Sequence, residues 1–127
     1  MKDEASWFLR KAEHALRAAQ TLLAADDPET AVGRAYYSML HTAQALLREQ
    51  DIRFRKHSSV HGAFGQHFTK TGLMDSKFHR WLLDSYDDRI RGDYDTEAVI
   101  GRESAELRVK QATEFLLTAR RWLESEA

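Results

Sequence analysis

Residues 27–47 read DPETAVGRAYYSMLHTAQALL, and this stretch decides the fold class. Aspartate is a preferred residue immediately before a helix, and proline is tolerated at the first helical position, so Asp27 and Pro28 mark a helix start. After them, apolar side chains recur every three or four residues: Val32, Ala35, Tyr36, Met39, Leu40, Ala43, Leu46 and Leu47. This spacing predicts a helix over about residues 28–50 with one buried face.

The segments on either side of this stretch also have a helical period. They predict a first helix over about residues 8–23, a short third helix capped by Ser58 or Ser59 and ended by Gly72, and a fourth helix capped by Asp75. The period resumes at about Thr96 in a long final helix. The fourth helix should bury its apolar residues, Phe78, Leu82, Leu83, Tyr86 and Ile90. Residues 1–127 thus predict one all-α domain, a bundle of five helices whose first, second and last are the longest.

Composition limits the functions that are open to such a bundle. The 19 basic and 20 acidic residues nearly cancel, so only a local basic cluster could bind nucleic acid. The chain has no cysteine, which excludes thiol nucleophiles and zinc–thiolate sites. Neither a signal-peptide core nor a run of about 20 apolar residues is present, so we expect a cytoplasmic protein with no membrane association.

The histidines are candidates for metal ligands and for groups that transfer protons. His57 and His61 stand four apart, but no acidic residue lies between Asp51 and Asp75 to complete a metal site, and we expect neither a metal nor another cofactor. Arg34 and His41 stand seven apart, nearly two helical turns, so both should point the same way about 10 Å apart along the axis. They could bridge one phosphodiester, or they could simply flank the core residue Tyr36.

Residues 87–95, DDRIRGDYD, form the second notable stretch. Gly92 can end the fourth helix, and Asp93 and Asp95 can start the next one. A turn of this kind does not by itself explain Arg89, Arg91 and Tyr94. Two guanidinium groups beside the amides of a following helix would favour an anion, and a tyrosine could stack on a base. Alternatively, Arg89 could pair with Asp93 or Asp88 while Tyr94 packs across the turn.

Together, GRAYYSMLHTAQALL, RKHSSVHGAF, FTKTGLM and DDRIRGDYD resemble the HEPN domain superfamily over about residues 5–124. The closest resemblance is to small stand-alone prokaryotic HEPN proteins encoded beside a minimal nucleotidyltransferase. It implies an up-and-down helical bundle, a homodimer, and a toxin, antitoxin or nucleotide-binding role. It also implies that Tyr94 matches a tyrosine that the partner nucleotidyltransferase modifies in some members.

Active members of this superfamily cleave RNA without metal, using an arginine followed after four to six residues by a histidine. This chain departs from that signature, because no histidine follows His79. A carboxylate such as Asp93 is a poor proton donor near neutral pH. Arg34 to His41 and Arg55 to His61 satisfy the spacing by count, but they lie on other elements than the signature normally occupies. The sequence therefore leans against an intact ribonuclease, although it leaves this possibility open.

We predict that Arg89, Arg91, Asp93 and Tyr94 form one RNA- or nucleotide-binding surface site, with His41 as a secondary member and Arg34 ranked last. The low rank of Arg34 follows from counting helix directions as up, down, up, down, which places the start of the second helix far from the end of the fourth. Arg34 could approach the site only if the third helix is a short crosswise element, or if it comes from the other subunit of a dimer. We also predict that Tyr37 and Trp81 are partly exposed, because each lies off its helix's apolar stripe.

Three functions remain open at this point. The chain could be the HEPN component of a toxin–antitoxin-like module that binds RNA or a nucleotide and associates with a nucleotidyltransferase. It could instead be a metal-independent ribonuclease, or a structural module for helical dimerisation.

Overall fold

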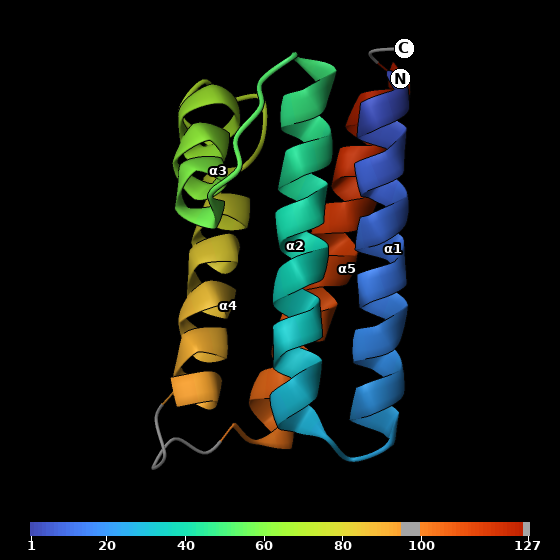
Figure 1. The fold of residues 1–127 in the computed structure, drawn as a ribbon, viewed down its shortest axis with the longest axis vertical. Helices are drawn as coiled ribbons and strands as arrows, with labels where there is room; N and C mark the ends of the chain where they lie inside the picture. Colours follow the sequence, from blue (N-terminus) through green and yellow to red (C-terminus); the bar gives the residue numbers. More distant parts are fainter. Residues whose placement is uncertain (95–99, 126–127) are drawn as a thin grey trace.

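The computed structural model describes residues 1–94 and 100–125, with the side chains of residues 93 and 94 left out, and these residues fold as an all-α helical bundle (Figure 1). Its helices are α1 (Asp3–Ala24), α2 (Pro28–Glu49), α3 (His57–Phe64), α4 (Ser76–Tyr94) and α5 (Arg102–Ser125). A π-helical segment, Gly65–Thr69, continues α3. The first, second and last helices are the longest, with 22, 22 and 24 residues, as the hydrophobic period predicts.

Two of the predicted helix starts are confirmed and one is wrong. The Thr30 amide donates to the Asp27 side chain at 3.3 Å, and the Lys77 amide donates to the Asp75 side chain at 2.9 Å. By contrast, α3 begins at His57 after Lys56, with no side-chain cap, so Ser58 and Ser59 do not cap it. A tertiary contact accounts for the early start, because the buried Tyr36 hydroxyl lies 3.5 Å from His57 Nδ1 and 2.8 Å from His61 Nε2.

The core is centred on α2, which contacts each of the other four α-helices. Its residues Tyr36, Met39, Leu40, Leu46 and Leu47 are at most 2% exposed. Aromatic rings from α3, α4 and α5 close the other side of this core, with Phe115 stacked on Phe78 and tilted against Phe64. The stripe read from residues 27–47 is therefore the central packing surface of the bundle.

Burial along α4 differs from the prediction. Phe78 and Leu82 are buried, whereas Tyr86 and Ile90 are half-buried and Leu83 is 38% exposed. Leu83 directly follows Leu82, and adjacent positions on a helix point about 100° apart, so the two cannot share one narrow buried face. The expected burial of Leu83 was wrong.

The predicted helix directions also need correction. α3 is a short element at one end of the bundle, so α2 and α4 run antiparallel and the start of α2 lies near the end of α4 (Figure 1). A Cβ at Gly92 would lie 3.5 Å from Cγ of Glu29, which confirms this proximity. The up, down, up, down count failed because it treated α3 as a full pass through the bundle.

The boundaries around α4 are likewise shifted. The helical segment before it ends at Thr69, three residues ahead of Gly72, which adopts a φ of 82° in the following turn. At its other end, α4 continues through Gly92 to Tyr94, so the prediction that Gly92 ends it was wrong. The expected restart at about Thr96 lies outside the described residues, and α5 is described from Arg102. No helix in the described chain is long and apolar enough to cross a membrane.

The π-helical segment brings its backbone against α4. A Cβ at Gly65 would lie 2.7 Å from Nε2 of His79, a separation that no real side chain tolerates without movement. The same Nε2 lies 3.1 Å from the carbonyl oxygen of His61 and is placed to donate to it. A side chain at position 65 would therefore displace the His79 ring from the carbonyl oxygen of His61, and glycine leaves room for this contact between α3 and α4.

Candidate functional site

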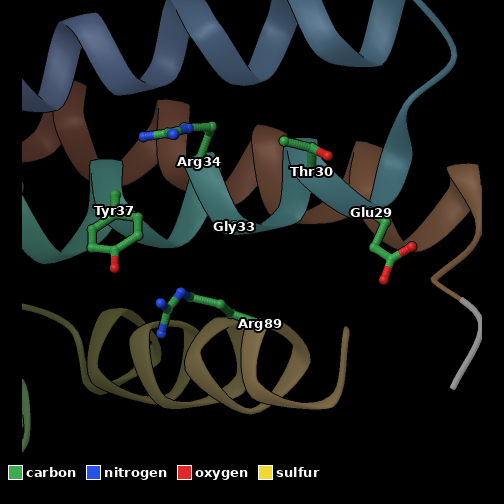
Figure 2. A pocket seen from close by; sticks show the side chains of 6 residues that line it. All are labelled: Glu29, Thr30, Gly33, Arg34, Tyr37 and Arg89. Carbon is green, nitrogen blue, oxygen red and sulfur yellow. The ribbon is translucent and has the colours of Figure 1, made fainter. Parts of the chain in front are cut away.

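A cavity of about 470 Å³ opens between α2 and α4. We refer to it as the α2–α4 cavity, and its lining residues are Glu29, Thr30, Gly33, Arg34, Tyr37 and Arg89. Figure 2 shows the Arg89 side chain extending from α4 toward Tyr37, while Arg34 extends from the α1 side of α2. The volume lies in the range of small-molecule sites, and the described lining carries two guanidinium groups and one carboxylate, that of Glu29. The cavity is therefore suited to an anionic ligand.

Arg89 is positioned by aromatic side chains of α2. Its guanidinium carbon lies 5.0 Å from the centre of the Tyr37 ring and 5.9 Å from that of Tyr36, both within cation–π range. Tyr37 is half-buried, as predicted from its place off the apolar stripe, and Trp81 is half-buried too. The aromatic platform restrains the guanidinium at the cavity wall, so less side-chain entropy is lost when a ligand binds.

Of the other members of the predicted DDRIRGDYD site, Arg91 is the one whose side chain can be placed relative to Arg89. Because α4 is continuous to Tyr94, Arg91 leaves the helix about 200° around from Arg89, and it is exposed and does not line the cavity. Asp88 is ion-paired with Arg108 of α5 at 2.7 Å. The side chains of Asp93 and Tyr94 lie outside the described residues. A turn that would have assembled the four residues is absent from the described part of α4.

A second cavity, of about 630 Å³, lies between α1 and α2. This α1–α2 cavity is lined by Lys11, His14, Ala15, Ala18, Arg34, Tyr37 and His41. Arg34 and His41 both line it, which confirms that their seven-residue spacing places them on one face of the helix. Arg34 and Tyr37 line both cavities, so the two adjoin along these side chains. We call the pair of cavities the groove.

His41 can act as a proton acceptor in the α1–α2 cavity. Its Nδ1 lies 2.8 Å from Oε1 of Gln44, and an amide oxygen only accepts, so Nδ1 holds the proton and Nε2 is the basic nitrogen. Burial is the main cause that lowers the pKa of His41, and Lys11 adds to this effect. At neutral pH the ring is therefore uncharged and can accept a hydrogen bond or a proton.

Beneath the groove lies a cluster of buried polar rings. His61 is 5% exposed, and burial together with His57 and His79 lowers its pKa to about 4. Burial also raises the pKa of Tyr36, whose hydroxyl can donate to the neutral His61 ring, and it lowers the pKa of His57, with Arg89 as a further cause. These histidines act as hydrogen-bonding core residues. No group of three metal-binding side chains occurs among the described residues.

Charge along the groove is mainly positive. Among the described residues that line it, Lys11, Arg34 and Arg89 contribute three cations, and Glu29 at one end is the only carboxylate. Glu13, which is also on α1, is ion-paired with Arg120 of α5. A chain with a formal charge of −1 thus carries a local basic surface of the kind that its composition still allowed.

Sequence reasoning missed two residues of this surface, Lys11 and His14. They stand three apart on α1, off the stripe formed by Phe8, Ala12, Ala15 and Leu16, so a single helical face could have been read from their spacing. Nothing in the spacing says which neighbour that face meets. The packing of α1 on α2 supplies this information.

Comparison with known proteins extends across nearly the whole chain. Residues 5–122 match the family of the HEPN domain. A Methanocaldococcus jannaschii protein named "Putative toxin MJ0142" is 33% identical over 98% of this chain and 84% of its own length. A second protein of that organism, "Putative toxin MJ0605", is 32% identical over 91% of this chain and 86% of its own length. A UPF0332 protein of Gloeobacter violaceus is 31% identical over 97% of this chain and 98% of its own length.

Proposed function

Because the chain belongs to the HEPN domain family, we propose that it is the HEPN component of a toxin–antitoxin-like module and binds RNA or a nucleotide in the groove. The observation that carries this proposal is that Arg34 of α2 and Arg89 of α4 line one cavity. Two guanidinium groups with a tyrosine between them offer charge-assisted donors to a phosphate and a hydroxyl to a sugar. The two Methanocaldococcus jannaschii relatives are named putative toxins, which supports a role in a toxin–antitoxin-like module.

Arg89→Ala tests the proposed ligand. We expect this change to weaken the binding of a fluorescently labelled single-stranded RNA about tenfold, because one charge-assisted contact contributes roughly 1.5–3 kcal/mol. Arg80→Ala is the matched control, since Arg80 is exposed on α4 and lies nine residues away, about half a turn around the helix. Fluorescence anisotropy measures both affinities, and circular dichroism verifies that both variants are folded. Equal affinities of the two variants would contradict the assignment of the cavity.

Arg91, Asp93 and Tyr94 remain part of the proposal in a different role. Tyr94 is the last residue of α4, five residues after Arg89 and therefore about one and a half helical turns beyond it. Placed there, the three residues would present the end of α4 to a partner protein, while Arg89 serves the groove. We propose that the chain forms a homodimer and that the partner is a nucleotidyltransferase, as the family resemblance implies.

The nucleotidyltransferase proposal has its own test. Purification from the native host is expected to recover a nucleotidyltransferase with the chain, and intact-mass spectrometry is expected to show a nucleotidyl group that fragmentation places on Tyr94. Tyr94→Phe lacks the acceptor oxygen, so it should lose the added mass and keep the partner. An unmodified wild-type chain from such a preparation would remove Tyr94 as the modified residue. Sedimentation at the 14.7 kDa mass of one chain would remove the homodimer.

A further inference from the structure

We propose that the α1–α2 cavity is a second phosphate subsite, so that the groove takes a nucleic-acid segment of at least two phosphates rather than a mononucleotide. This inference rests on the proposed function and specifies its ligand. It assigns Lys11 and Arg34 as the cations of the second subsite, and it assigns Arg34 together with Arg89 to the first.

The shape of the groove favours a ligand longer than a mononucleotide. The cavities of about 470 and 630 Å³ adjoin through Arg34 and Tyr37, and each alone is large enough for a nucleotide-sized group. A mononucleotide would leave one of the two cavities empty. A nucleic-acid chain that passes over Arg34 and Tyr37 would occupy both, because these two residues line both cavities.

The distribution of charge also favours a second phosphate. The described residues that line the α1–α2 cavity include no carboxylate, and its lysine and arginine, Lys11 of α1 and Arg34 of α2, lie on opposite walls. The side chains of Lys11 and Arg34 make no ion pair with any residue in the described part of the chain. No carboxylate of the described residues therefore neutralises their charges, and a phosphate between the two walls would neutralise both.

The neutral polar side chains of the α1–α2 cavity suit the sugar of a nucleotide. His41 presents Nε2 as an acceptor because Gln44 holds Nδ1, and the exposed His14 lies on the facing helix. An acceptor beside two cations matches a sugar hydroxyl attached to a phosphate, because the hydroxyl donates while the phosphate only accepts. Ala15 and Ala18 leave the floor of the cavity free of long side chains.

Competition binding tests the second subsite, with labelled hexaadenylate as the probe and either adenosine 5′-monophosphate or 5′-phosphorylated diadenylate as the competitor. The readout is the ratio of the two competitor affinities. In the wild-type protein we expect the diadenylate to bind about tenfold tighter, because it gains a second charge-assisted contact. Lys11→Gln should bring this ratio close to one and reduce the salt dependence of hexaadenylate binding by roughly 0.7 in the log–log slope. Lys110→Gln, on the exposed face of α5, should keep the wild-type ratio and slope.

A second pair of variants distinguishes an effect on the second subsite from an effect on folding. Ala18→Glu and Ala18→Gln introduce side chains of equal length into the α1–α2 cavity, and only the first is charged. We expect Ala18→Glu to bind the diadenylate about tenfold more weakly than Ala18→Gln does. The second subsite is overturned and the proposed function stands if the wild-type protein binds hexaadenylate, Lys11→Gln keeps the wild-type competitor ratio, and the two Ala18 variants bind the diadenylate equally. Failure of the wild-type protein to bind any of the three probes overturns both.

Discussion

Arg34→Ala is expected to weaken the binding of single-stranded RNA by about 100-fold, more than any other single change in the groove. Arg34 is the only cation that lines both cavities among the described residues, so its loss removes a charge-assisted contact from each of two phosphates. At roughly 1.5 kcal/mol for each contact, the combined loss corresponds to about two orders of magnitude in affinity. Anisotropy titration with labelled RNA measures this loss.

Two further variants show whether the effect comes from the site. Arg34 is exposed and its side chain makes no ion pair with the described residues, so the free energy of unfolding should change by less than about 0.5 kcal/mol. Arg121→Ala on α5 removes an exposed arginine elsewhere and should leave RNA binding unchanged. Arg34→Lys keeps the charge without the planar fork, so an intermediate affinity is expected. An Arg34→Ala variant that binds as tightly as Arg121→Ala would show that RNA does not occupy the groove.

The surroundings of Arg34 are also the part of the site that the sequence predicted least well. The apolar stripe of residues 28–47 and the Asp27–Pro28 start are local signals, and they predicted α2 almost to the residue. Arg34 and His41 were correctly placed on one face for the same reason. The approach of α4 to the start of α2 was not predicted, because the direction of α4 depends on how far α3 extends. A helix of eight residues that continues into a π-helical segment has no distinctive period from which its length could be read.

Gly92 shows a second limit of local reasoning. Glycine after an apolar run is a common helix end, but α4 passes through this position. A Cβ there would lie 3.5 Å from Glu29 and 3.6 Å from Ile100, so the glycine lies where the end of α4 approaches the start of α2. These are ordinary van der Waals distances, so the packing does not itself require a glycine at this position. A glycine in the sequence thus marked neither the end of α4 nor a position too crowded for a side chain.

Protein stability is expected to fall as the pH is lowered from 6.5 to 4, with His61 contributing a loss of about 3 kcal/mol. Burial lowers the pKa of His61 from 6.5 to about 4, so across this window the unfolded chain binds a proton that the folded chain does not. The folded state is therefore favoured above the window and is progressively disfavoured within it. Below pH 4 both states are protonated, and the contribution of His61 to the pH dependence ends.

The groups around His61 set the sign of this effect. His57 and His79 lower its pKa further, and Asp87 opposes them only in part. Burial lowers the pKa of His57 and of His41 as well, so both add to the loss in the same direction. Tyr36 stays protonated throughout, because burial raises its pKa, and it can donate to His61 only while that ring is neutral.

His61→Gln isolates the contribution of His61 to this loss. The amide can still accept a hydrogen bond from Tyr36 but does not titrate, so urea unfolding at both ends of the window should show a drop smaller than the wild-type drop by about 3 kcal/mol. Equal drops in the two proteins would show that His61 takes up its proton in the folded state. Because His61 and His57 lie beneath Tyr37 and Arg89, acid uptake at this cluster would also loosen the α2–α4 wall of the groove. RNA binding should then weaken over the same pH range in the wild-type protein, and less so in His61→Gln.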